Sequence, residues 1–146
     1  MLIEGLFAYL AADAGLAEQL GTTSTRRDHT TGIFPTVAPE SVPVPYVVCQ
    51  QVAGEPLQTS FQGTGRLQTA RWRFSAYGST YLQAKKVAEA LRLALLGMYG
   101  SLVAGDVCIQ GAWLELEADD SEPIPHGNIY STHLDFSINF VDNVAA

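Results

Sequence analysis

Cysteine is scarce in this chain, with two residues in 146. Cys49 and Cys108 each lie in a strand-like stretch, so we expect buried thiols rather than a disulfide scaffold. Long apolar runs are also missing, which excludes a membrane-spanning helix, and the N-terminus lacks a signal peptide's basic region and cleavage site. These absences predict a protein that stays in the cytoplasm in which it is made.

Basic residues are few as well. Eight Lys and Arg against fifteen Asp and Glu give a formal net charge of -7. A protein that binds nucleic acid through its phosphates needs a surface rich in Lys and Arg, so this charge balance argues against a nucleic-acid-binding protein. The negative net charge is compatible with a protein past which nucleic acid moves without binding. The length and the 47% hydrophobic content indicate one domain over residues 1–146.

Motifs for catalysis and for cofactors are missing too. The three histidines are far apart, and none has the spacing of a HExxH-like or Cys/His metal site. Gly63 and Gly65 lack the context of a phosphate loop, and no Gly-x-Ser-x-Gly elbow is present. His133 and Asp135 on one strand form a weak pattern for a shared metal or proton, with a surface pair as the simpler interpretation. We therefore expect no enzyme and no cofactor.

The most informative stretch runs from Leu67 to Gly97. Its first half alternates apolar with polar residues, which predicts a strand with one apolar and one cationic face. Gly78 ends that pattern, and Thr80 with Gln83 fits a capping box that begins a helix. Gly97 then offers a left-handed stop. The buried stripe of this helix is expected at Ala84, Val87, Ala88, Leu91, Leu95 and Met98.

The other segments complete the predicted architecture. Leu2 to Leu20 shows one apolar face and predicts a single helix. Strands are expected at 33–37, which Pro35 places at an edge, and at 46–53, 106–117 and 129–142, with a bulge near Gly111. The order α-β-β-β-α-β-β predicts an α+β fold. Its antiparallel sheet of about four to five strands carries two helices on one face.

Three groups of residues are candidate contact sites. The helix-free face of the sheet is too polar for a second core layer, and an aromatic at the tip of the 54–66 arm either docks to another chain or folds back. The polar segment 22–32 is expected to be a loop that orders on binding. The candidate interface residues are Phe61, Arg66, Arg71, Arg73, His133 and Asp135; the acidic cluster is Glu115, Glu117, Asp119, Asp120 and Glu122; the docking loop holds Arg26, Arg27, Asp28 and His29.

Scattered residues over most of the chain resemble the tail-completion or tail-terminator proteins of long-tailed bacteriophages and related tail-like particles. The segment 22–31 is longer than usual in that family, and Tyr77-Gly78 stands where a bulkier pair is common. The resemblance rests on residues 10–16 with Leu20-Gly21, Ile33-Phe34-Pro35, Val44–Val48, Arg71–Tyr77, Tyr81, Ala84, Ala88–Arg92 and Leu134-Asp135-Phe136.

The resemblance implies a ring, commonly hexameric, that caps the finished tail tube. Such a ring stops tube polymerisation and offers a docking surface to the head–neck connector, while DNA passes its lumen without specific binding. It places the protein in the tail or neck of a virion assembled in the host cytoplasm. The alternatives are another head–tail connector, a tube subunit, or a small-ligand binding domain that uses His133 and Asp135.

The opposite charges of two predicted surfaces suggest how subunits meet. Ring contacts join different patches of neighbouring copies, and the cationic face at Arg71 and Arg73 complements the acidic cluster from Glu115 to Glu122. The acids could instead line the channel and repel DNA, or form a solvated cluster.

Overall fold

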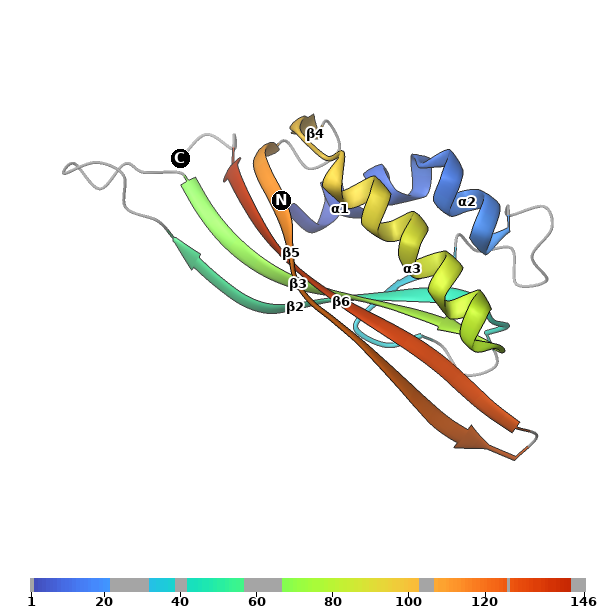
Figure 1. Ribbon diagram of the computed structural model, residues 1–146. Coiled ribbons are helices and arrows are strands. Elements are labelled where there is room, and N and C mark those ends of the chain that lie inside the picture. The colour runs from blue at the N-terminus through green and yellow to red at the C-terminus, as the bar shows by residue number, and fades with distance from the viewer. Residues whose placement is uncertain are drawn as a thin grey trace.

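The computed structural model describes residues 2–21, 32–38, 42–56, 67–102, 107–125 and 127–142. All the labelled helices lie on the same face of one long, twisted sheet (Figure 1). This arrangement confirms the predicted α+β class and the position of the helices. The elements in chain order are α1 (Leu2–Ala12), α2 (Ala14–Leu20), β1 (Ile33–Pro35), β2 (Tyr46–Pro56), β3 (Leu67–Gly78), α3 (Tyr81–Leu96), β4 (Gly100–Leu102), β5 (Val107–Ile124) and β6 (Gly127–Asp142).

The sheet has six strands in the order β1-β2-β3-β6-β5-β4. β1 pairs in parallel with β2, and the other neighbours are antiparallel. The predicted position of β1 at an edge is confirmed, but its expected antiparallel pairing is wrong because the connection from Pro35 to Tyr46 returns the chain to the same end of the sheet. β4 was not predicted, since three residues are too short to show a periodicity.

The core lies between the helices and one face of the central strands. Trp72 and Phe74 of β3 lie beside Phe136 and Leu134 of β6, and all four side chains are buried. The alternation predicted for the first half of 67–97 is therefore confirmed in β3, and β6 shows the same pattern of burial. Their remaining inward residues and the stripe of α3 complete the core: Ala70, Ala76, Ile138, Phe140, Ala84, Val87, Ala88, Leu91, Leu95 and Met98.

The N-terminal helix is broken at Asp13, so the prediction of one helix from Leu2 to Leu20 is wrong. The Asp13 carboxylate accepts a hydrogen bond of 2.9 Å from the Leu16 amide and caps α2. The break reorients the second half, so that Leu16 is buried and Ala14 is exposed. α2 ends at Gly21, whose φ of 83° favours glycine.

The junction between β3 and α3 is compact. Thr80 Oγ1 accepts a hydrogen bond of 3.1 Å from the Gln83 amide, and Gln83 Oε1 accepts one of 2.8 Å from Ser79 N–H. The predicted helix start is thus confirmed, with the glutamine bonding one residue earlier than the usual capping box. At the other end, Gly97 has a φ of -84°, so the expected left-handed stop is wrong.

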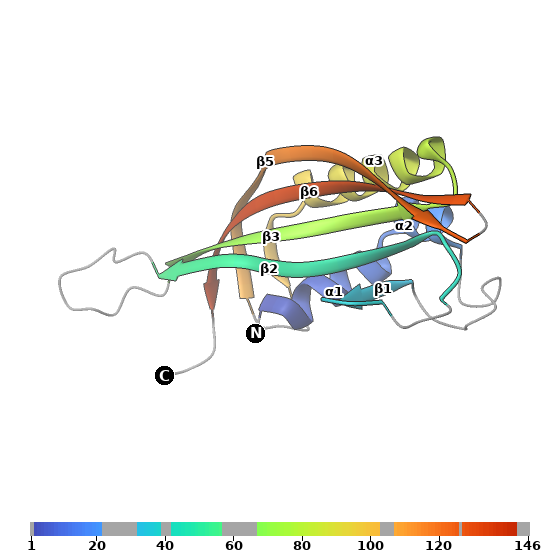
Figure 2. The same cartoon turned by 90° about the horizontal axis from the view of Figure 1, so that it is seen from below.

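β5 continues beyond its predicted end at Glu117 to Ile124, so the acidic cluster lies on a strand. With β6 it forms a long hairpin that projects beyond the other strands (Figures 1 and 2). Acidic residues weaken the local strand pattern, but pairing with the regular strand β6 supplies the backbone hydrogen bonds. The register shifts between Ile109 and Gly111, as predicted, and again between Leu114 and Leu116.

Gly78 offers a sharp test of the packing at the β3–α3 junction. A Cβ there would lie 2.7 Å from the backbone nitrogen of Ala84. We expect Gly78→Ala to destabilise the protein by about 1–3 kcal/mol, because α3 would have to move. Urea denaturation at neutral pH measures this change. The matched control is Gly15→Ala in α2, whose Cβ meets nothing closer than 3.5 Å and which should gain up to about 1 kcal/mol. Equal effects of the two substitutions would contradict the close packing.

Candidate functional site

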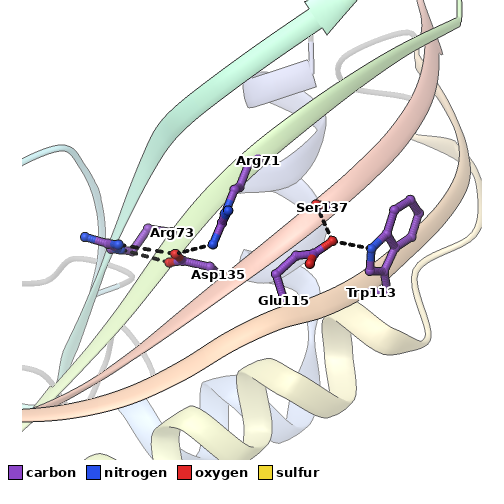
Figure 3. Close-up of polar contacts among 6 residues, drawn as sticks. All are labelled: Arg71, Arg73, Trp113, Glu115, Asp135 and Ser137. Carbon is purple, nitrogen blue, oxygen red and sulfur yellow. Dashed lines mark hydrogen bonds and ion pairs between the residues drawn. The ribbon is translucent and has the colours of Figure 1, made fainter. Parts of the chain in front are cut away.

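The helix-free face of the sheet carries an ionic cluster formed by Arg71, Arg73 and Asp135. Arg73 Nε donates to Asp135 Oδ1 at 2.8 Å, while its Nη2 and that of Arg71 each donate to Oδ2 at 3.2 Å. The β3–β6 register places Arg73 directly opposite Asp135 (Figure 3). One carboxylate therefore holds two guanidinium groups, and we name these three residues the arginine–aspartate cluster.

Asp135 is buried although it faces away from the helices. Its side chain is 3% exposed, whereas each arginine side chain is 43% exposed. Hydrogen bonds and charge from Arg73, with a further contribution from Arg71, lower the pKa of Asp135 against the opposing effect of desolvation. The same contact raises the pKa of Arg73. The carboxylate is thus held ionised under the two arginines, whose side chains form the exposed part of the cluster.

The arginine–aspartate cluster carries a net positive charge, since two cations share one anion. Arg71 Nε is buried, and it has no hydrogen-bond partner among the described residues. The cationic face predicted from the sequence is therefore half neutralised within the chain. One positive charge of the cluster remains without a counter-charge among the described residues.

Glu115 lies beside this cluster on β5. Its Oε1 accepts a hydrogen bond of 2.9 Å from Ser137 Oγ and another from the indole N–H of Trp113 (Figure 3). Trp113 is nevertheless 42% exposed. Glu115 is thus oriented by its neighbours, and an aromatic surface lies next to it at the edge of the hairpin.

Two of the predicted acidic residues pair with α3 instead of facing away from the molecule. Lys85 Nζ lies 2.7 Å from Asp119 Oδ1 and 3.9 Å from Glu117 Oε1, and Tyr81 donates to Asp119 at 3.0 Å. Hydrogen bonding from Lys85 is the main cause that lowers the pKa of Asp119. The sequence does not predict this anchor, because the spacing of residues along the chain carries no signal of a contact between a helix and a distant strand.

The two acids nearest the tip have different surroundings. The described residues place no cation within ion-pair distance of Asp120 or Glu122. Glu122 lies close enough to Tyr46 and Tyr77 to contribute to their raised pKa values, for which burial is the largest cause. The two tyrosine rings stack with centroids 4.8 Å apart. Among the described residues, Asp120 and Glu122 therefore keep unpaired negative charge, as does Glu115, whose two hydrogen-bond donors are neutral.

His133 and Asp135 do not share a ligand or a proton. His133 Nδ1 lies 2.6 Å from Ser75 Oγ, and its Nε2 lies 3.4 Å from Ser131 Oγ, while Asp135 is occupied by the arginines. The described residues contain no group of three or more His, Cys, Asp or Glu that could hold a metal ion. This geometry gives no support to the small-ligand alternative.

The prediction of a buried thiol is confirmed for Cys49 but not for Cys108. Both are free, Cys49 is buried and Cys108 is half-buried. Burial raises the pKa of the Cys49 thiol to about 12, which makes it unreactive at neutral pH. None of the described helices has the length and apolar character needed to cross a membrane.

Several predicted contact residues lie outside the described residues. These are the docking loop, the aromatic tip of the 54–66 arm and the arginine that follows it: Arg26, Arg27, Asp28, His29, Phe61 and Arg66. Their assignment as contact residues stays a prediction. Among the described residues, the structure brings Arg71, Arg73 and Asp135 together and divides the acidic cluster into paired and unpaired members.

Comparison with known proteins supplies an independent observation. The model of a family described as tail completion protein gp17 matches residues 4–139. The fold resembles a chain from the virion of a native gene transfer agent (GTA) particle, with a TM-score of 0.64 and 21% sequence identity. The match covers 93% of this chain and 91% of that chain. No curated protein matches the sequence.

The buried carboxylate gives a test with a defined pH dependence. We expect Asp135→Asn to destabilise the protein by about 3 kcal/mol at pH 7, the lower end for a broken buried ion pair, because the arginines keep contact with water. Since the pKa of Asp135 is lowered by folding, its stabilisation is present above pH ~3.9 and is lost as the pH falls through the lower folded value.

The difference between wild type and Asp135→Asn should therefore shrink in urea denaturations carried from pH 7 down to pH 2. Arg92→Ala is the control, because the one ion pair of Arg92 with a described residue is an exposed contact of 3.9 Å with Glu89, so the substitution should change stability by less than about 0.5 kcal/mol. A difference between wild type and Asp135→Asn that stays constant with pH would show that the carboxylate charge does not stabilise the fold.

Proposed function

The chain belongs to the tail completion protein gp17 family, and from that premise we propose that it is a structural virion protein that forms a ring on the end of the tail tube. The ring ends tube polymerisation and provides the surface to which the head–neck connector binds. The family match over residues 4–139 carries this proposal, because it covers the sheet and the helices together.

The charge distribution supports a ring built from unlike patches. Rings form when one patch of a subunit meets a different patch of the next. The arginine–aspartate cluster keeps one positive charge, while Asp120 and Glu122 keep their negative charges. Opposite patches on one subunit favour head-to-tail association and set its register and rate.

The absence of a catalytic arrangement among the described residues agrees with a structural role. The ionisable groups that are brought together there, Asp135 with its arginines and Asp119 with Lys85, are paired and stabilise the fold. The net charge of -7 also suits a ring through which DNA slides without specific binding, since carboxylates repel phosphates.

Electron microscopy of particles assembled without this protein tests the proposal. We expect tails of uncontrolled length, or full-length tails that never join heads, and restoration when the wild-type protein is supplied. Normal tails joined to heads would contradict the proposal. Absence of any tail would point to a tube subunit, and light scattering of the purified protein separates the two: a terminator stops at one ring, whereas a tube subunit polymerises without limit.

A charge reversal tests the role of the unpaired acids. We expect Asp120→Lys with Glu122→Lys to block ring formation, measured by light scattering, because two attractive groups become repulsive. The matched control is Glu4→Lys with Glu18→Lys, which makes the same change of net charge on exposed helix positions. Rings that form while DNA delivery slows would instead assign the acids to the channel wall. Normal rings and normal delivery would dismiss both roles.

A further inference from the structure

Both long outer strands of the sheet have open edges. β4 pairs with β5 only from Val107 to Ile109, and β1 pairs with β2 only from Val47 to Cys49. Among the described residues, no strand pairs with the outer side of β5 from 111 to 124 or of β2 from 50 to 56. Apart from the Ala53 carbonyl and the Ser121 amide, which bond to neighbouring side chains, the outward-facing backbone groups of such an edge can add a strand from another chain.

The two edges differ in charge. Gln50 to Gly54 on β2 is exposed and carries no charge, and Val52 is 41% exposed. Proteins usually protect such an edge with charged side chains or proline, which β2 carries only at Glu55 and Pro56, so the uncharged part from 50 to 54 favours a strand partner. The β5 edge carries the acidic cluster. Two β5 edges would bring carboxylates against carboxylates, and this repulsion disfavours pairing of β5 with its own copy.

Positive charge lies one strand behind the β2 edge. Arg73 pairs with Gln50 and Arg71 with Ala53, all on the helix-free face. A strand added to β2 would lie about 10 Å from β3, which is two strand spacings and within reach of extended arginine side chains. Asp120 lies on the same face of β5, opposite Ser131. An added β5 would thus bring unpaired carboxylates toward the arginine–aspartate cluster.

We propose that β5 of one copy adds to the open edge of β2 in the next copy, so that the sheets of neighbouring subunits continue into one another. This inference rests on the proposed ring and specifies its contact. Two different edges make a head-to-tail contact, which closes into a ring when the rotation between copies allows it. Pairing of β2 with a second β2 would make a closed dimer and leave β5 uncovered.

Cysteine cross-linking tests the contact in the full-length protein with Cys108→Ser, which removes the half-buried native thiol. Gln50→Cys in one batch is mixed with Trp113→Cys, Leu116→Cys or Ala118→Cys in another, all exposed and on the helix-free face. Three positions are scanned because a disulfide needs Cα atoms about 4.4–6.8 Å apart. After oxidation, the linked peptides are identified by mass spectrometry, and light scattering reports whether rings have formed.

We expect a disulfide between Gln50→Cys and at least one β5 position, at a yield roughly tenfold above the control, because docked strands have a high effective concentration. The control replaces the β5 partner by Leu82→Cys, which is exposed at the start of α3. Neither partner should form a disulfide with its own copy.

Each other outcome has a defined meaning. Rings without any β2–β5 disulfide overturn this contact and leave the proposed function standing. Disulfides between two copies of the Gln50→Cys variant, or between two copies of one β5 variant, overturn this contact in favour of pairing between identical edges. A protein that stays monomeric at high concentration and forms no disulfide overturns the ring and the contact together. A β2–β5 disulfide in unlimited polymers supports the contact and rejects the terminator.

Discussion

The pairing of β3 with β6 is the constraint on which the rest of the molecule depends. Trp72 and Phe74 face the helices next to Phe136 and Leu134, while Arg73 faces Asp135 on the other side. A slip of one residue would expose the aromatic rings and bury the arginines. The register is therefore specified twice, by apolar burial on one face and by an ion pair on the other.

The position of this core leaves both ends of the sheet uncovered by the helices. The β5–β6 hairpin extends past the helices at one end of the sheet, and β2 and β3 extend past them at the other (Figure 1). Lys85 fixes the hairpin to α3 through Asp119, so its outer edge is a defined surface despite its acidic sequence. Polar residues such as Lys85 and Asp119 thus fix the geometry of the fold. This is the chemistry expected of a structural component of a tail.

Local signals in the sequence were sufficient for much of the architecture. The alternation in β3 and β6, the cap at Thr80 and the bulge near Gly111 each arise from a few neighbouring residues. The break at Asp13 was missed because the apolar spacing continues across it, and only burial of Leu16 reveals the new orientation of α2. The parallel pairing of β1 depends on the path of a connection, for which no periodicity exists.

The sequence by itself determined the α+β class, the apolar faces and the excess of negative charge, because these follow from residues close together in the chain. Tertiary structure alone decided which charged side chains are paired within the chain and which are not. It placed Asp135 under two arginines and Asp119 beside Lys85, and it left Asp120 and Glu122 without a cation among the described residues. These pairs join residues far apart in sequence, and electrostatic attraction falls off with distance in space, which chain spacing does not specify.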